Sequence, residues 1–145
     1  MRILCVCTGN TCRSPMLAAL LEAAVRGKGL GVTVESAGTA AGQGENASAG
    51  ALAAMARRGL DLTGHRSRPL VELDLTGYDH IFTVSSRHAA FVRAQGVPAE
   101  RISVVAADRG GVPDPWGGGD ADYEAAAMTL EAEAARLARA LSSSP

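Results

Sequence analysis

The chain has 145 residues, a length that suits one domain with its own hydrophobic core. Hydrophobic residues make up 47% of it but aromatic residues only 3%, so the core must consist mainly of Ala, Val, Leu and Ile. The net charge of -1 provides no basic excess, which argues against nucleic acid or an anionic membrane surface as a partner.

The first half of the chain predicts two strand–helix pairs. Residues 2–6 form an apolar run that stops at Thr-Gly-Asn, which is typical of a buried strand. A helix is expected next, with Ser14 as its N-cap and Pro15 at its first helical position. Residues 31–36 predict the second strand, and residues 47–62 predict the second helix.

The second half repeats this alternation. Residues 79–84 predict a third strand, and residues 85–96, which begin with Ser and end with Gly, predict a third helix. Residues 101–106 predict the fourth strand and residues 120–143 a long final helix. Acidic residues in the first turn of that helix and arginines in its last turns suit the helix dipole.

Strands that are apolar throughout, each followed by a helix, predict an α/β fold. We expect a doubly wound, four-stranded parallel sheet flanked by helices on both faces, in a single domain over residues 1–145. Such folds bind ligands at the carboxyl ends of strands, near the point where strand order reverses. The first strand leads directly into a loop that contains cysteines, so we expect the chemistry there.

No segment indicates export or membrane insertion. The apolar run in MRILCVC is too short for a signal peptide, and no stretch approaches the roughly 18 apolar residues of a membrane span. Three cysteines at one end of the chain form a poor disulfide framework. We therefore expect a cytoplasmic protein with reduced thiols and with neither nucleic acid nor membrane as partner. The sequence leaves the oligomeric state open.

The three cysteines could form a metal site, a redox pair or one activated nucleophile. Their spacing, C-x-C-x4-C, lacks the fourth ligand and the paired arrangement of a structural zinc site. A thioredoxin-like pair needs C-x-x-C, which is absent. Cys5 belongs to the predicted strand and suits a small buried side chain. We expect neither a metal ion nor a cofactor.

Cys7 and Arg13 form a C-x5-R-S pattern between the first strand and the first helix. Such a loop can direct its backbone N–H groups at one centre and bind an anion, aided by the positive end of the helix. Arg13 adds a guanidinium that can bind two oxygens at once. Gly9 and Asn10 are residue types that accept the left-handed conformations expected of this loop. Because the same groups favour a thiolate at Cys7, the pattern predicts covalent phosphoryl transfer.

This chemistry also needs an acid that protonates the leaving group. The loop after the fourth predicted strand provides Asp114 between two prolines, with Trp116, the only tryptophan, close by. Asp-Pro alone is typical of a turn. In the presence of the C-x5-R-S loop, we interpret Asp114 as the acid.

Four segments of the chain resemble the low-molecular-weight protein tyrosine phosphatase family. They are VCTGNTCRSPM, SAGT, LDLTGHRSRPL and DPWGGG, and they occur in the family's order across essentially the whole chain. The resemblance implies a cysteine-dependent phosphatase acting on phosphorylated proteins. In it Cys7 is the nucleophile, Arg13 binds the phosphate and its transition state, and Asp114 acts as acid and then as base toward water.

The resemblance also implies supporting roles. Ser14 would hydrogen-bond the nucleophilic sulfur, and Asn10 would hold the loop in shape with Ser36 as a partner. His65 matches a family histidine that supports the loop, although an ordinary histidine at a helix end explains it equally well. Cys12 would be the second loop cysteine, which could capture an oxidised nucleophile as a disulfide.

Thr8, Gly9 and Thr11 are expected to line the phosphate site, together with Cys12 and Trp116. In the family's tyrosine phosphatases, Leu and Ile usually stand at the positions of Thr8 and Thr11, whereas CTGNTCRSPM resembles the bacterial protein arginine phosphatases. An aliphatic side chain packs on a tyrosyl ring, while a threonine hydroxyl accepts a hydrogen bond from a guanidinium. Trp116 could stack on either group. We expect phosphoarginine as the substrate, with phosphotyrosine as the alternative.

Two further functions on the same scaffold are disfavoured. A thioredoxin-coupled arsenate reductase needs additional cysteines downstream, and none follows Cys12. A non-catalytic phosphate-binding module would not need a nucleophile, an arginine and an acid together.

Overall fold

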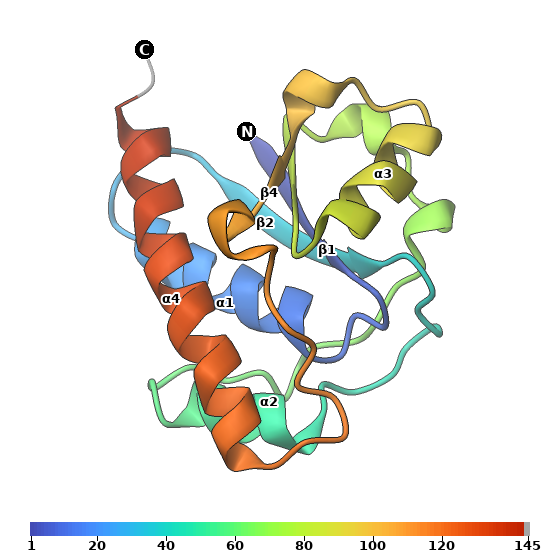
Figure 1. Ribbon diagram of the computed structural model, residues 1–145. Coiled ribbons are helices and arrows are strands. Elements are labelled where there is room, and N and C mark those ends of the chain that lie inside the picture. The colour runs from blue at the N-terminus through green and yellow to red at the C-terminus, as the bar shows by residue number, and fades with distance from the viewer. Residues whose placement is uncertain (144–145) are drawn as a thin grey trace.

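A computed structural model describes residues 1–143 (Figure 1). The last two residues of the expected domain, 144 and 145, lie outside this range. The strands form one parallel sheet in the order β2-β1-β3-β4. They are β1 (Arg2–Cys7), β2 (Thr33–Gly38), β3 (His80–Thr83) and β4 (Ile102–Val104). The predicted four-stranded parallel sheet is confirmed, and its strand order reverses beside β1.

Helices cover both faces of the sheet, as predicted (Figure 1). The helices are α1 (Arg13–Val25), α2 (Ala49–Ala56), α3 (Ser86–Ala94) and α4 (Asp120–Ser142). One core joins α1, α2 and α4 to one face of the sheet, and a second core joins α3 to the other. Short 3-10 turns complete the connections: η1 (Leu70–Glu72), η2 (Leu75–Gly77), η3 (Ala99–Arg101) and η4 (Ala107–Arg109).

The central strand β1 shows why the sheet is buried on both sides. Ile3 and Cys5 belong to the core beneath α1 and α4, while Leu4 and Val6 belong to the core beneath α3. All four side chains are fully buried. Because successive side chains in a strand point to opposite faces, only a continuous apolar run can satisfy both cores.

The start of α1 differs from the prediction. Cys12 is the N-cap residue, so Ser14 and Pro15 lie inside the first turn, and the prediction of Ser14 as cap was wrong. The Ser14 hydroxyl instead contacts the Cys7 sulfur, which outweighs a local capping bond. Pro15 is tolerated there because the first N–H groups of a helix lack intrahelical partners in any case.

Some strand boundaries also differ from those predicted. β2 lies two residues later than residues 31–36, because it pairs along the whole of β1, from Arg2 with Thr33 to Cys7 with Gly38. β4 is shorter than residues 101–106, because Ala106 has a left-handed backbone (φ 53°) that turns the chain out of the sheet. No helix within residues 1–143 is long and apolar enough to cross a membrane.

Candidate active site

The loop from Cys7 to Arg13 connects the carboxyl end of β1 to the amino end of α1. Asn10 has the expected left-handed backbone, with φ of 57°. Gly9 does not, contrary to our expectation, and a Cβ at this position would meet only Thr11 Oγ1 at 3.7 Å. The tight loop therefore depends on Asn10, which tolerates this conformation because its short polar side chain bonds locally.

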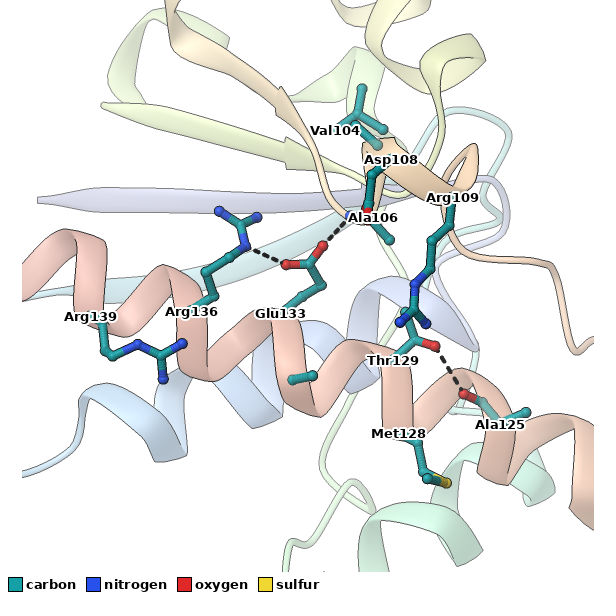
Figure 2. A pocket seen from close by; sticks show the side chains of 12 residues that line it. Val104, Ala106, Asp108, Arg109, Ala125, Met128, Thr129, Glu133, Arg136 and Arg139 are labelled. Atoms are coloured by element: carbon teal, nitrogen blue, oxygen red, sulfur yellow. Dashed lines mark hydrogen bonds and ion pairs between the residues drawn. The ribbon is translucent and has the colours of Figure 1, made fainter.

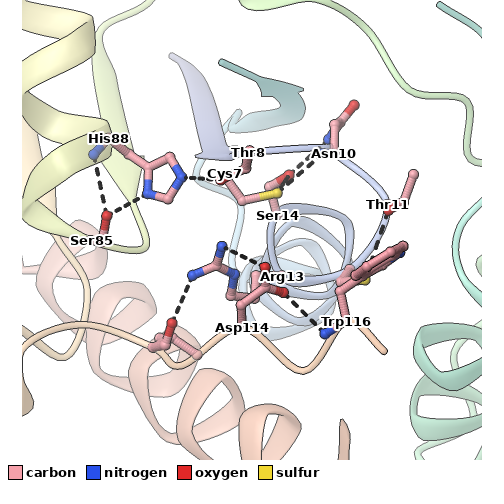
Figure 3. Close-up of polar contacts among 12 residues, drawn as sticks. Cys7, Thr8, Asn10, Thr11, Arg13, Ser14, Ser85, His88, Asp114 and Trp116 are labelled. Atoms are coloured by element: carbon pink, nitrogen blue, oxygen red, sulfur yellow. Dashed lines mark hydrogen bonds and ion pairs between the residues drawn. The ribbon is translucent and has the colours of Figure 1, made fainter. Parts of the chain in front are cut away.

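The Cys7 thiol lies at the floor of this loop and is 3% exposed. Its sulfur lies 2.9 Å from Ser14 Oγ and accepts the Asn10 N–H at 3.3 Å, as Figure 3 shows for the labelled side chains. The sulfur also lies near the amino end of α1. Cys5 is different: it is fully buried in the strand, and burial raises the pKa of its thiol. Its expected packing role agrees with this position.

Asn10 is the centre of a buried network behind the loop. Its side-chain amide donates to Ser14 Oγ at 2.8 Å and to Ser36 Oγ at 3.0 Å, and its Oδ1 accepts the Arg68 N–H at 2.9 Å. His65 Nε2 donates to the Asn10 carbonyl at 2.7 Å. Burial lowers the pKa of His65, so the ring is neutral at pH 7 and carries its proton on Nε2. The structure thus brings both Ser36 and His65 to the loop.

Gly38 allows the chain after β2 to approach this loop. A Cβ on Gly38 would lie only 2.3 Å from the Thr8 carbonyl oxygen and 2.8 Å from the Ala41 side chain. The Ala40 N–H donates to that same carbonyl at 3.0 Å. A larger residue would therefore push the SAGT segment away from the phosphate loop.

Arg13 and Asp114 face one another across the site (Figure 3). The Arg13 guanidinium is buried and donates to the Val112 carbonyl at 2.8 Å, and its other nitrogen lies 3.6 Å from Asp114 Oδ2. Asp114 remains 52% exposed, and its Oδ1 accepts the Trp116 N–H at 3.1 Å. Asp114 therefore forms a turn and also presents a carboxylate to the site.

These residues enclose a cavity of about 290 Å³. Its walls are Cys7, Thr8, Gly9, Thr11, Cys12, Arg13, Glu45, Asp114 and Trp116. Asn10 and Ser14 were also expected to bind the phosphate, but both are buried behind the loop and do not line the cavity; the other residues expected to contact phosphate or substrate do. Trp116 is 72% exposed and stands at the rim. The Cys7 thiol forms the floor of this cavity.

A larger cavity, of about 780 Å³, lies along α4 beside η4 (Figure 2). Arg109, Arg136 and Arg139 line it, and Glu133 pairs with Arg136 at 2.6 Å and also accepts the Ala106 N–H. None of the expected site residues contributes to its walls. We therefore do not take this cavity as the candidate catalytic site, although its volume is larger.

His88, which was not among the predicted site residues, lies beneath the loop. His88 Nε2 lies 2.7 Å from Thr8 Oγ1, and Nδ1 lies 2.5 Å from Ser85 Oγ, the N-cap of α3 (Figure 3). Burial, assisted by the charges of Arg13 and Arg87, lowers the pKa of His88 to about 4. The ring is therefore neutral at pH 7 and holds the Thr8 side chain. Its position just after β3, at the same sheet edge as the cysteine loop, was an available signal.

Cys12 has partners from two distant segments. Its sulfur lies 3.2 Å from Ser48 Oγ and 3.4 Å from the Tyr123 hydroxyl of α4. All three cysteines are free thiols. Within residues 1–143, no group of His, Cys, Asp or Glu is arranged to hold a metal ion.

Comparisons with known proteins agree with this geometry. The sequence pattern described as "Low molecular weight phosphotyrosine protein phosphatase" matches residues 2–144. A protein-arginine-phosphatase from Geobacillus stearothermophilus is 39% identical, covering 97% of this chain and 95% of that protein. A low molecular weight protein-tyrosine-phosphatase from Streptomyces coelicolor is 33% identical, covering 97% and 93% respectively.

One solved structure extends the similarity to three dimensions. It is a mutant of the YwlE arginine phosphatase with a phosphorylated active-site serine. It superposes with a TM-score of 0.91 at 32% identity and covers 99% of this chain and 97% of that chain.

Proposed function

Because the chain belongs to the low molecular weight phosphotyrosine protein phosphatase family and is a hydrolase of that class, we propose that it dephosphorylates phosphoarginine in proteins. The observation that carries this proposal is one cavity in which the Cys7 thiol, the Arg13 guanidinium and the Asp114 carboxylate converge. We further propose that residues 1–145 act as one phosphatase domain.

In the first step, the Cys7 thiolate attacks phosphorus and forms an S–P bond while the bond to the leaving group breaks. Arg13 and the loop N–H groups bind the phosphoryl oxygens, because they present positive charge where negative charge develops. Asp114 donates a proton to the departing nitrogen. The product is an unmodified arginine side chain and a cysteinyl phosphate.

In the second step, a water molecule attacks the cysteinyl phosphate. Asp114, now ionised, takes a proton from this water, and the S–P bond breaks to release inorganic phosphate and the thiolate. The Ser14 hydroxyl, 2.9 Å from the sulfur, can donate a hydrogen bond to the departing thiolate. The acid is thereby returned to its starting protonation state.

Thr11 supports phosphoarginine over phosphotyrosine. Its side chain lines the cavity, and its hydroxyl lies 3.8 Å from the Cys12 sulfur, which is a weak contact. The hydroxyl can therefore accept a hydrogen bond from a substrate guanidinium, which a tyrosyl ring cannot donate. Phosphotyrosine is the second candidate, because the exposed Trp116 ring at the rim could stack on a phenyl ring.

We also propose that Cys12 protects Cys7 from irreversible oxidation. An oxidant such as hydrogen peroxide would convert the Cys7 thiolate to a sulfenic acid. Attack by the Cys12 thiol on this sulfenic acid would then form the S–S bond, and the thiol proton would leave with the sulfenic hydroxyl as water. Peroxide-treated protein should contain a Cys7–Cys12 bond and recover activity with a thiol reductant, and irreversible loss without this bond would contradict the role.

The net charge of -1 and the free cysteines support a cytoplasmic enzyme whose partners are phosphorylated proteins. Nucleic acid and membrane surfaces are not among the proposed partners.

The proposal is tested with two peptides of one sequence that carry phosphoarginine or phosphotyrosine at the same position. We expect a higher kcat/KM for phosphoarginine in the wild type and a shift toward phosphotyrosine in Thr11→Ile. Thr33→Ile, at the exposed amino end of β2, is the matched control and should leave the preference unchanged. Cys7→Ser should abolish turnover. A wild-type preference for phosphotyrosine would overturn the assignment of phosphoarginine as the substrate but not the phosphatase activity.

A further inference from the structure

Glu45 lines the substrate cavity, yet the phosphatase chemistry does not use it. Its carboxylate makes no hydrogen bond or ion pair with any of residues 1–143, whereas the other charged groups of the cavity, Arg13 and Asp114, face one another at 3.6 Å. An unpaired carboxylate repels a phosphate dianion that enters the same cavity. Its presence is therefore unfavourable unless the rest of the substrate carries positive charge.

The backbone of Glu45 is held firmly by the buried Ser67. The Glu45 N–H donates to Ser67 Oγ at 2.8 Å, and the Ser67 N–H donates to the Glu45 carbonyl at 2.8 Å. Ser67 Oγ in turn donates to the Gly42 carbonyl at 2.7 Å. The Glu45 carboxylate lies over Gly42, where a Cβ would come within 2.9 Å of Oε1. Glycine at this position leaves the carboxylate room to lie there.

The same segment that anchors Glu45 also anchors the phosphate loop. His65 donates to the Asn10 carbonyl at 2.7 Å, and the Arg68 N–H donates to Asn10 Oδ1 at 2.9 Å. Ser67 lies between these two residues and fixes Glu45. The backbone of Glu45 and the phosphate loop are therefore anchored by the same segment, which keeps the Glu45 side chain beside the cavity.

The two candidate substrates differ in the chemical group to which the phosphoryl group is attached. In phosphoarginine this group is a planar guanidinium that carries delocalised positive charge and several N–H donors, the natural partner of a carboxylate. In phosphotyrosine it is an aromatic ring with no positive charge and no donor. A carboxylate near the bound phosphoryl group thus attracts the first substrate and disfavours the second.

We propose that Glu45 is a specificity-determining residue whose carboxylate binds the guanidinium of the phosphoarginine substrate at the wall of the cavity. The inference rests on the proposed phosphoarginine phosphatase function. It assigns to Glu45 the charge recognition of the substrate, while the Thr11 hydroxyl contributes a neutral hydrogen bond.

The test measures kcat/KM of wild type and Glu45→Gln on the matched phosphoarginine and phosphotyrosine peptides. Loss of one partly exposed ion pair should lower kcat/KM for phosphoarginine about fivefold. The value for phosphotyrosine should stay the same or rise, because repulsion of the phosphate dianion is removed. Added salt should lower the ratio of kcat/KM for phosphoarginine to kcat/KM for phosphotyrosine in the wild type. The same addition should change this ratio less in Glu45→Gln.

Glu100→Gln is the matched control. Glu100 is exposed and lies in η3, which precedes the amino end of β4, at the edge of the sheet opposite the site. Glu100→Gln removes the same charge but far from the cavity. Its preference between the two peptides should therefore equal that of the wild type. Both variants should melt at the wild-type temperature, because neither carboxylate has a partner within residues 1–143.

The outcomes separate the two proposals. A wild type that prefers phosphotyrosine overturns the phosphoarginine function itself. A wild type that prefers phosphoarginine, with the same preference in Glu45→Gln, overturns only the role of Glu45. A third substrate, N-acetyl phosphoarginine amide, has no flanking residues. If the effect of Glu45→Gln is absent on this compound, Glu45 recognises a basic neighbour in the peptide, and the inference is wrong.

Discussion

Replacement of Asn10 by alanine would remove the centre of the network that holds the phosphate loop. The side chain makes hydrogen bonds to Ser14, Ser36 and the Arg68 N–H, and the residue itself has a left-handed backbone. Loss of these bonds costs about 1 kcal/mol each. Alanine in the left-handed region adds roughly 1 kcal/mol. We expect Asn10→Ala to lower the free energy of unfolding by about 4 kcal/mol, a large part of an ordinary domain's stability.

Urea unfolding followed by circular dichroism at 25 °C measures this loss. Ser36→Ala removes a single bond to the same amide and should cost about 1 kcal/mol. Because that bond is lost in each single variant, the double variant should cost about 1 kcal/mol less than the sum of the two.

Two results would refute this reasoning. One is a loss below about 1 kcal/mol for Asn10→Ala, which would mean that the loop holds its shape without this side chain. The other is strict additivity with Ser36→Ala, which would mean that the two side chains do not interact.

Three more predictions concern contacts outside the loop network. Gly50→Ala should destabilise the fold by about 1–3 kcal/mol despite the better helix propensity of alanine, because its Cβ would lie 2.3 Å from the Tyr123 ring; a raised melting temperature would contradict this. The pKa of His88 is about 4 when folded, against 6.5 as the ordinary value. The unfolded chain therefore binds this proton first as the pH falls. The neutral His88 ring should therefore contribute fully to the free energy of unfolding above pH 6.5. This contribution should fall by about 1–2 kcal/mol as the pH drops toward 4, after allowance for hydration near the exposed Thr8. A pH series of unfolding free energies that runs parallel in wild type and His88→Gln would contradict it. Trp116→Ala should leave stability within about 0.5 kcal/mol, since the ring is 72% exposed, and raise KM several-fold; an unchanged KM for both peptides would remove Trp116 from the substrate site.

The cysteine loop shows how much local pattern can predict. The apolar run of β1 indicated burial on both faces, and the spacing of Cys7 and Arg13 indicated a loop at the carboxyl end of that strand. Both features depend on neighbours within a few residues. Asp114 required one more step, because only the topology of a parallel sheet brings the loop after β4 to the same edge.

The error at Ser14 has the opposite cause. Its residue type favours a helix N-cap, but its hydroxyl lies 2.9 Å from the Cys7 sulfur and accepts from the Asn10 amide. A local preference worth about 1 kcal/mol was outweighed by a buried contact network.

By itself, the sequence determined the order of strands and helices, the doubly wound sheet and the place of the cysteine loop between the first strand and the first helix, because periodicity, turn residues and loop spacing are local. Only the tertiary structure revealed the positions of His88 beneath Thr8, Tyr123 against Cys12 and Glu45 on the cavity wall. His88 and Tyr123 meet the loop across 80 and 111 positions of chain, and Glu45 lines the same cavity from more than 30 positions away. No local pattern encodes such contacts, because they arise when separate elements pack on one sheet edge.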